Sequence, residues 1–334
     1  MIHIKIDSLK VKQYAKLIDT SKGNYKSISN KLQCWIDTNP NPADLNIIIA
    51  QDIKNNLEKI LTAIPNELDL LILRYERNGY QRAIFDPNDG RQGKLTDFGN
   101  ILYKIFNYKS FRSSAKAIWF SESLMIKSCT TCNTQYTLKT YKKNNTKLLF
   151  HLDHYFPKSV YPYLSLSYYN LIPCCASCNM SKSNKPFKIN ENIHPYIENF
   201  HDIARFNLSK KSLVEFLIDP NKNHEKIEYK VELRSKYLGK VEYNKKLQNY
   251  LNEFKINEQY NQFKDVAAEM YLRSKYYHKV RRKELKEFFY SSSINITDEL
   301  INRLILGNYH DDKDLLNRPL AKFMKDIGQD IKLI

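Results

Sequence analysis

The chain has 334 residues, 42% of them hydrophobic, and its 53 Lys and Arg against 36 Asp and Glu give a formal net charge of +17. This apolar content supports a packed core and argues against wholesale disorder. No apolar run approaches the roughly 20 residues that a membrane span needs, and the N-terminus lacks the apolar stretch of a signal peptide. A cytoplasmic protein without a membrane partner is therefore expected.

The excess of positive charge favours polyanionic partners. Nucleic acids come first, because each neutralised phosphate releases condensed counterions. The alternative is an A/T-rich genome that encodes Lys, Asn and Tyr freely, in which case the charge indicates no partner.

The first predicted segment, residues 1–124, is an N-terminal helical domain. Apolar residues at helical spacing predict a helix over 44–64, which Pro65 stops. Turn-forming residues predict a loop over 85–93. Further helices are predicted over 68–75, 97–106 and 111–124.

The central segment, residues 125–190, contains five of the six cysteines. In a reducing compartment, clustered Cys-x-x-Cys pairs indicate a metal more often than a disulfide. Two intervening residues let both sulfurs of a pair reach one tetrahedral Zn²⁺ at about 2.3 Å. Cys174 is then a buried thiol, and Cys34 a small apolar filler in a helix. We predict that a structural zinc ion is bound by Cys129, Cys132, Cys175 and Cys178.

Residues 147–154, between the two pairs, are predicted to form a strand, and residues 179–185, after the second pair, the start of a short helix. Hydrolysis of a phosphodiester needs a hard, oxygen-ligated cation and a neutral imidazole to take a proton from water. Asp153 and the Asn179 amide oxygen suit the cation, and His154 suits the base. His151 lies on the same strand face as Asp153, so metal ligation, phosphate binding and packing all remain open for it.

The segment resembles the HNH endonuclease family in its zinc-stapled ββα-metal form. The resemblance covers residues 125–190, less than a quarter of the chain. Where the family name ends on a second His, this chain has Asn179, which still offers an oxygen ligand. The matching residues are Cys129-x-x-Cys132, Leu152-Asp153-His154, Asn170-Leu171-Ile172-Pro173 and Cys175-x-x-Cys178-Asn179 with Lys182 after it.

The resemblance implies a role for each of these residues. His154 resembles the general base, Asp153 and Asn179 the ligands of a catalytic Mg²⁺ or Mn²⁺, and Asn170 the residue that braces the loop and orients the base. The family hydrolyses DNA to 5′-phosphate and 3′-hydroxyl ends. At the expected helix start, Lys182 and Lys185 would hold flanking phosphates through charge and the helix dipole; plain solvated charge is the alternative.

The third segment, residues 191–334, is predicted to be mostly helical. A helical region is expected over 228–290, preceded by strand-like pieces such as 204–208. Thr297 is a candidate helix cap, Gly307 ends that helix, and a last helix runs to Ile331. A basic run over 273–286, interleaved with tyrosines, suits a nucleic-acid surface or a packed helix with its lysines outward.

The sequence thus predicts a mainly α protein with a small central α+β element, acting as a metal-dependent endonuclease on DNA. Its flanks resemble those of bacterial HNH nucleases, some of them effectors of phage defence that work with an ATPase partner. Two alternatives remain: a non-catalytic zinc-ribbon module that binds nucleic acid, and an HNH nuclease acting on RNA.

Overall fold

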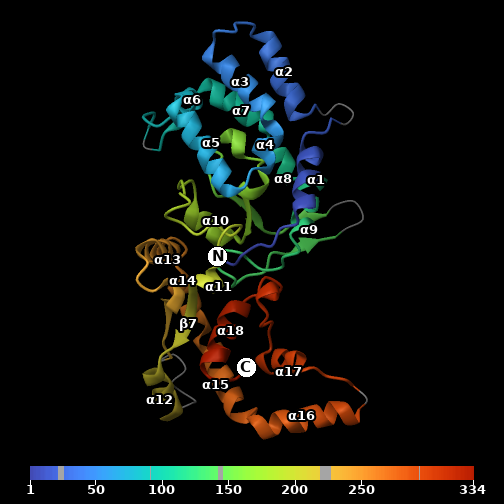
Figure 1. Ribbon diagram of the computed structural model, residues 1–334, viewed down its shortest axis with the longest axis vertical. Coiled ribbons are helices and arrows are strands. Elements are labelled where there is room, and N and C mark those ends of the chain that lie inside the picture. Colours follow the sequence, from blue (N-terminus) through green and yellow to red (C-terminus); the bar gives the residue numbers. More distant parts are fainter. Residues whose placement is uncertain (22–25, 91, 142–145, 219–226, 293) are drawn as a thin grey trace. The chain divides into compact units, whose positions relative to one another are not determined.

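The computed structural model describes residues 1–21, 26–90, 92–141, 146–218, 227–292 and 294–334 (Figure 1). The chain divides into two compact units, each assembled from separated segments. Unit 1 comprises Met1–His3, Ile126–Thr137 and Glu198–Ile334, and unit 2 comprises Ile4–Met125 and Leu138–Ile197. The three predicted segments therefore differ from the two units: the N-terminal helices share unit 2 with most of the central segment.

The described residues are mostly helical with small sheets, as the sequence predicts. Each sheet in this part of the chain is a pair of antiparallel strands. None of the described helices is both long and apolar enough to cross a membrane.

Unit 2 begins with nine helices within its described residues. The helix predicted over 44–64 is interrupted at Asn56, so that it forms α3 and α4. Pro65 does more than stop α4: it opens α5, where a first-turn proline costs no hydrogen bond. The helix predicted over 97–106 is confirmed as α7. The elements are α1 (Ser8–Ile18), α2 (Ile28–Thr38), α3 (Leu45–Asn55), α4 (Leu57–Thr62), α5 (Pro65–Arg77), α6 (Tyr80–Ile84), α7 (Asp97–Phe106), α8 (Tyr108–Arg112) and α9 (Ala115–Ser123).

The described residues of unit 2 also form three antiparallel strand pairs. The loop predicted over 85–93 begins with β1 (Phe85–Asp86), which pairs with β2 (Lys94–Leu95). The single strand predicted over 147–154 is wrong, because it divides into two strands with different partners. These are β4 (Lys147–Leu148), which pairs with β3 (Lys139–Thr140), and β5 (His151–His154), which pairs with β6 (Leu171–Cys174).

The helix α10 (Ala176–Lys182) follows β6 directly. It begins three residues before the predicted start at 179, because the chain turns into the helix immediately after Cys175. Lys182 is its last residue and not part of its first turn. A lysine there faces the negative end of the helix dipole, so the predicted dipole-assisted phosphate site at the helix start is wrong.

The N-terminal helices hold β5 and the loop after it. The Tyr108 hydroxyl donates to the Leu152 carbonyl at 2.8 Å, and the Arg112 guanidinium donates to the carbonyls of Leu148 and Phe150. On α1, the Tyr14 hydroxyl donates to the Leu166 carbonyl at 2.8 Å. These side chains satisfy backbone groups that strand pairing leaves open, which explains why the helices and the hairpin form one unit.

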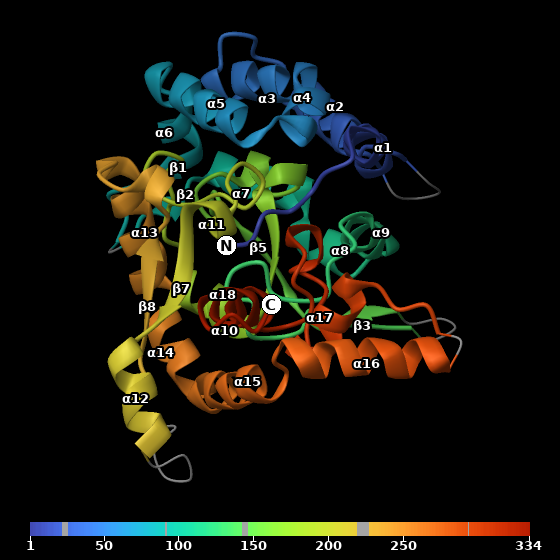
Figure 2. The ribbon, with the colours of Figure 1, turned by 60° about the horizontal axis from the view of Figure 1, so that its bottom comes forward.

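Unit 1 is built around one hairpin and a C-terminal helix. β7 (Ala204–Leu208), a predicted strand, pairs with β8 (Tyr229–Leu233); β8 corrects the prediction of helix from residue 228. α18 (Ala321–Asp330) lies beside β7 (Figure 2), and its Asp326 carboxylate accepts from the Phe206 amide at 2.9 Å. The other helices are α11 (Phe200–Ile203), α12 (Lys210–Ile218), α13 (Val241–Glu253), α14 (Ile256–Tyr260), α15 (Lys264–Tyr276), α16 (Lys279–Ser291) and α17 (Asp298–Leu306).

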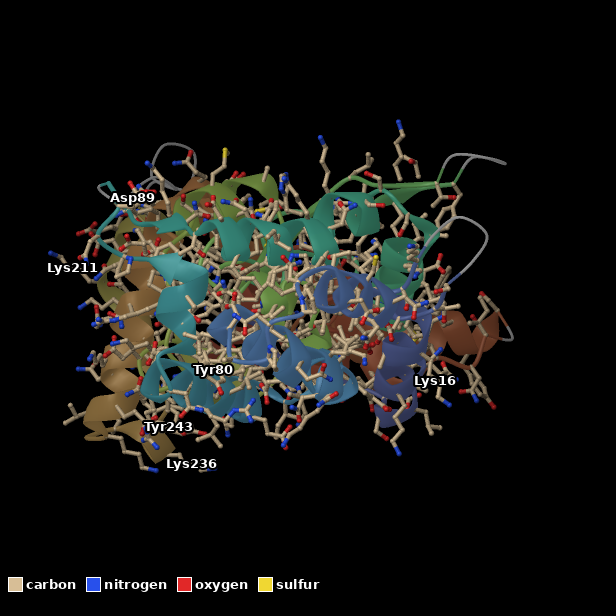
Figure 3. All side chains as sticks on the ribbon, turned by 90° about the horizontal axis from the view of Figure 1, so that it is seen from above. Lys16, Tyr80, Asp89, Lys211, Lys236 and Tyr243 are labelled. Atoms are coloured by element: carbon tan, nitrogen blue, oxygen red, sulfur yellow. The ribbon has the colours of Figure 1, made fainter. Side chains whose placement is uncertain are left out.

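The caps predicted for α17 are confirmed. The Thr297 hydroxyl accepts from the Leu300 amide, and Gly307 takes the left-handed conformation at φ 77° that ends the helix. Cys34, by contrast, lies exposed on α2, so the prediction of an apolar filler is wrong. Many of the lysines behind the net charge lie at the surface, among them Lys16, Lys211 and Lys236 (Figure 3).

Candidate active site and metal centre

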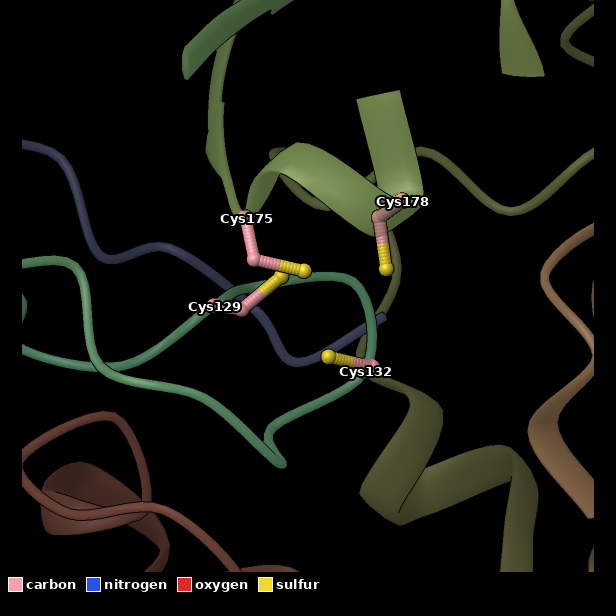
Figure 4. A group of neighbouring side chains, drawn as sticks. All are labelled: Cys129, Cys132, Cys175 and Cys178. Atoms are coloured by element: carbon pink, nitrogen blue, oxygen red, sulfur yellow. The ribbon is translucent and has the colours of Figure 1, made fainter. Parts of the chain in front are cut away.

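Four buried cysteines form a cluster that can hold a metal ion such as zinc. Their Sγ atoms all lie within 4.8 Å of one another, and Figure 4 shows the sulfurs directed toward a common centre. A tetrahedral Zn²⁺ with Zn–S bonds of about 2.3 Å requires sulfurs about 3.8 Å apart, so small side-chain shifts suffice. Cys174 is buried but is not in the cluster. The members are those predicted: Cys129, Cys132, Cys175 and Cys178.

The turn that carries the first cysteine pair is fixed by hydroxyl groups of its own unit. The Tyr260 hydroxyl donates to the Cys132 carbonyl at 2.7 Å, and the Tyr250 hydroxyl donates to the Thr131 carbonyl. The Thr134 hydroxyl lies 3.1 Å from Cys132 Sγ, where it can donate to a thiolate. Such donors stabilise the deprotonated sulfur that a metal needs.

A cavity of about 410 Å³ opens in unit 2 at the β5 strand. It brings together three of the predicted catalytic residues, Asp153, His154 and Asn179, although β5 and α10 are separated by more than 20 residues. Its lining also includes His151, Tyr108 and Lys158. A concave site with convergent polar groups is the usual setting for catalysis.

His154 is buried and held by its neighbours. Its Nε2 lies 2.9 Å from the Ser165 carbonyl oxygen, which can only accept, so Nε2 carries the proton and Nδ1 keeps a lone pair. The Tyr108 ring meets the imidazole edge-on, with centroids 4.4 Å apart. Burial, with a smaller contribution from the positive charge of Lys158, lowers the pKa of His154 to about 3. The ring is therefore neutral at physiological pH.

Asp153 lies beside a buried lysine. Lys182 Nζ donates to the His154 carbonyl at 2.6 Å and lies 3.5 Å from Asp153 Oδ2. Burial raises the pKa of the Asp153 carboxyl, and the positive charge of Lys182 opposes that rise. The Lys182 side chain is only 1% exposed, so its ammonium serves this carboxylate and the β5 backbone. The predicted contact between Lys182 and a substrate phosphate requires a solvent-exposed ammonium, and this ammonium is buried.

Asn170 lies outside the cavity and is fully buried. Its Oδ1 accepts from the Phe156 amide at 2.7 Å, and its Nδ2 donates to the carbonyls of Phe156 and Leu164 at 3.0 and 2.9 Å. All of its amide groups thus bind the loop after β5. Because Leu164 precedes Ser165, the same loop carries the carbonyl that orients His154.

Lys158 and Tyr108 are among the cavity residues that were not predicted from the sequence. Lys158 is half-buried, lies 5.6 Å from the centre of the Tyr108 ring, and has its pKa lowered by burial while Asp153 opposes the shift. In the sequence, only the position of Lys158, five residues after Asp153 on the turn beyond β5, indicated that it could lie near the site. Tyr108 belongs to α8, and nothing in its local sequence connects it with β5.

The remaining predicted residues fall into two groups. Lys185 and His151 are exposed, His151 in the site cavity and Lys185 in a neighbouring one. The basic run of 273–286 is largely paired within unit 1. Its ion pairs are Arg273–Glu269, Arg281–Glu284, Lys283–Glu287 and Lys286–Asp298. Because these pairs are exposed and α16 has no buried residue, the pairing does not distinguish the two alternatives for this run.

Comparison with known proteins gives one short match. The chain is 40% identical over 50 residues to protein Ea31 of Escherichia phage lambda, an alignment that covers 14% of this chain and 17% of Ea31. No family model matches the chain, and no solved structure matches it.

Proposed function

We propose that the protein is a metal-dependent endonuclease of the HNH type, with its active site in the cavity beside β5. The observation that carries the proposal is His154: a neutral imidazole whose Nε2 is tied to a carbonyl, whose Nδ1 keeps its lone pair, and which shares a cavity with Asp153 and Asn179. The order β5, β6, α10 supports an interpretation as the ββα core of that family.

In the proposed reaction, His154 Nδ1 accepts a proton from the attacking water. The Ser165 carbonyl holds the opposite nitrogen, so the imidazolium that forms keeps its position, and Asn170 secures the loop that carries Ser165. Lys158 lies where its ammonium can meet a phosphate oxygen in the same cavity. Lys182 partly balances the charge of Asp153 when no other cation is near.

The donor set suits a hard divalent cation. One carboxylate and one amide oxygen, with room for water in the cavity, match the way Mg²⁺ is bound in proteins. A cation held by Asp153 and Asn179 would supply electrostatic stabilisation of the charge on the phosphate. The zinc of the cysteine cluster has a structural role, since four thiolates leave no open coordination position.

The test is cleavage of supercoiled plasmid and of matched single-stranded DNA and RNA, with and without Mg²⁺ or Mn²⁺. We expect metal-dependent cutting of DNA that leaves 5′-phosphate ends, and His154→Ala to reduce the rate by about 10²–10⁴-fold, the usual contribution of general base catalysis. His278→Ala, at an exposed histidine of unit 1, is the matched control and should cut normally.

The same experiment separates the alternatives. Cutting of RNA in preference to DNA would change the substrate while keeping the mechanism. Nucleic-acid binding without any cutting, together with full zinc content, would overturn the nuclease in favour of a zinc-ribbon binding module. Cutting that survives His154→Ala would overturn the assignment of the base. Three parts of the proposal rest on the family resemblance: that the substrate is DNA, that the protein acts in phage defence, and that an ATPase is its partner.

A further inference from the structure

A second and larger cavity, of about 710 Å³, adjoins the candidate active site within unit 2. Ser183 and Asn184, the residues that follow α10, line both cavities. Ser159 of the second cavity is also the chain neighbour of Lys158 in the first. Because the two cavities share these residues, a molecule bound in the candidate active site can extend directly into the second cavity.

The walls of this cavity come from two parts of the chain. The β1–β2 hairpin and α7 contribute Lys94, Asn100 and Tyr103, and the segments after β5 and α10 contribute Val160 and Lys185. The hairpin wall is held to α7 because the Thr96 hydroxyl accepts from the Gly99 amide at the start of the helix. The residues Lys94, Asn100 and Tyr103 of the first wall lie outside residues 125–190, the range of the resemblance, so this wall is contributed by the N-terminal part of the chain.

The chemistry of the lining suits a nucleic-acid strand. It carries two ammonium groups, those of Lys94 and Lys185, and no carboxylate. Lys94 is ion-paired with Asp89 at 2.9 Å, but both side chains are exposed, so solvent screens that pair. Tyr103 is a large aromatic residue left 38% exposed on α7. An exposed ring beside cations is the arrangement on which an unstacked base rests while its phosphates follow the charge.

We propose that the second cavity binds unpaired nucleotides on one side of the scissile phosphate, with a base stacked on Tyr103 and a phosphate at Lys185. The proposal rests on the proposed nuclease function for its position in the reaction. It deepens that function by making the substrate a strand that is single-stranded next to the cut, because a base within a duplex offers no free face to a ring in a cavity.

The test measures binding separately from cleavage. In a His154→Ala background without Mg²⁺, the affinity of a fluorescent single-stranded DNA 12-mer is measured by anisotropy over a range of salt concentrations. We expect Tyr103→Ala to weaken binding roughly tenfold with an unchanged salt slope, and Tyr103→Phe to retain binding, because stacking on an aromatic face carries the contact. Lys185→Ala should lower the log–log salt slope by about 0.7, as one lost phosphate contact does on a single strand.

Matched controls separate the cavity from the rest of the surface. Tyr141→Ala, at an exposed tyrosine of the same unit outside the cavity, should bind like the parent. A blunt duplex of the same length should lose little affinity on Tyr103→Ala. Equal affinity of Tyr103→Ala and Tyr141→Ala for the single strand would overturn the proposal, and so would an equal loss for the duplex.

A second readout uses the active enzyme. Substrates shortened on one side of the cut should lose kcat/KM roughly tenfold with the parent and not with Tyr103→Ala, because that variant has no contact left to lose. Stacking without any cutting would leave the binding site standing and overturn the nuclease. Normal cutting without any effect of Tyr103→Ala in either assay would overturn the binding site and leave the proposed nuclease in place.

Discussion

Each unit buries a cluster of charged residues around a histidine, and the two clusters are organised differently. In unit 2, His154 binds one carbonyl and lines a cavity. In unit 1, His201 lies 2.9 Å from Asp312, while Asp326 is ion-paired with the buried Lys322 and accepts from the Phe206 amide. Burial lowers the pKa of both histidines to about 3, with the lysines beside His201 contributing.

The comparison teaches that a buried histidine with a shifted pKa does not by itself mark a catalytic site. Both clusters meet that criterion. In the unit 1 cluster the charged groups pair with one another and bind the β7 backbone, where Asp326 and Asp330 accept from the amides of Phe206 and Leu208. The unit 2 cluster keeps a lone pair and opens to a cavity. In the proposed nuclease, the cavity and the unprotonated ring nitrogen of His154 distinguish the unit 2 cluster from the unit 1 network.

The largest expected effect concerns a third buried group, the four thiols. Cys175→Ser should release the bound zinc and unfold the core, because structural zinc binding is coupled to folding with apparent free energies of about 10–16 kcal/mol. Zinc content by a colorimetric chelator and circular dichroism measure both. Cys174→Ser, at a buried thiol outside the cluster, should keep its zinc. A folded, zinc-loaded Cys175→Ser protein would disprove the ligand assignment.

A crossed pair of substitutions tests the comparison directly. Asp326→Asn should lower the free energy of unfolding by about 3–5 kcal/mol, because it leaves the buried Lys322 ammonium without its counter-charge, and cleavage by the folded fraction should be unchanged. His154→Ala should lose cleavage even in its folded fraction. Urea titration and plasmid cleavage are measured on both. Loss of cleavage in folded Asp326→Asn would show that the unit 1 cluster serves catalysis.

Lys158→Ala should have an intermediate effect. It removes the half-buried ammonium of the site cavity, and we expect cleavage to fall about 10–100-fold, in the range of a lost charged contact to a phosphate. Lys325→Ala, at a lysine that is ion-paired with Asp312 in the unit 1 cluster, is the matched control. If both variants cut at the parent rate, Lys158 has no part in the reaction.

The smallest effect is a dependence of stability on pH that both histidines share. Below pH 6.5 the unfolded histidine takes up a proton that the folded one, with a pKa of about 3, does not. Stability contributed by the neutral ring is thus present above pH 6.5 and is lost as the pH falls toward 3. Each histidine contributes up to about 1.4 kcal/mol per pH unit.

Urea titrations between pH 7 and pH 5 measure this dependence. His154→Gln and His201→Gln should each flatten it by a similar amount, and His278→Gln, at an exposed histidine, should leave it as it is. An unchanged slope in either of the first two variants would show that the histidine concerned is not held neutral.

The sequence by itself determined what depends on short spacing. Two residues between cysteines define a turn that offers both sulfurs to one ion, so the four members of the cluster could be predicted. The limits of α7 and the caps of α17 are equally local, since they follow from apolar periodicity and from Thr297 and Gly307. Adjacent residues Asp153 and His154 had to share one strand end because they are neighbours in β5.

The tertiary structure decided what each side chain can do. Lys182 looked like a solvent-exposed cation, but packing against β5 buried it on the His154 carbonyl. Tyr108 entered the site because α8 packs against a strand more than 40 residues away. Charge, tautomer and access at His154 all depend on such distant neighbours, because burial and hydrogen bonding are set by the elements that surround a group and not by its place in the chain.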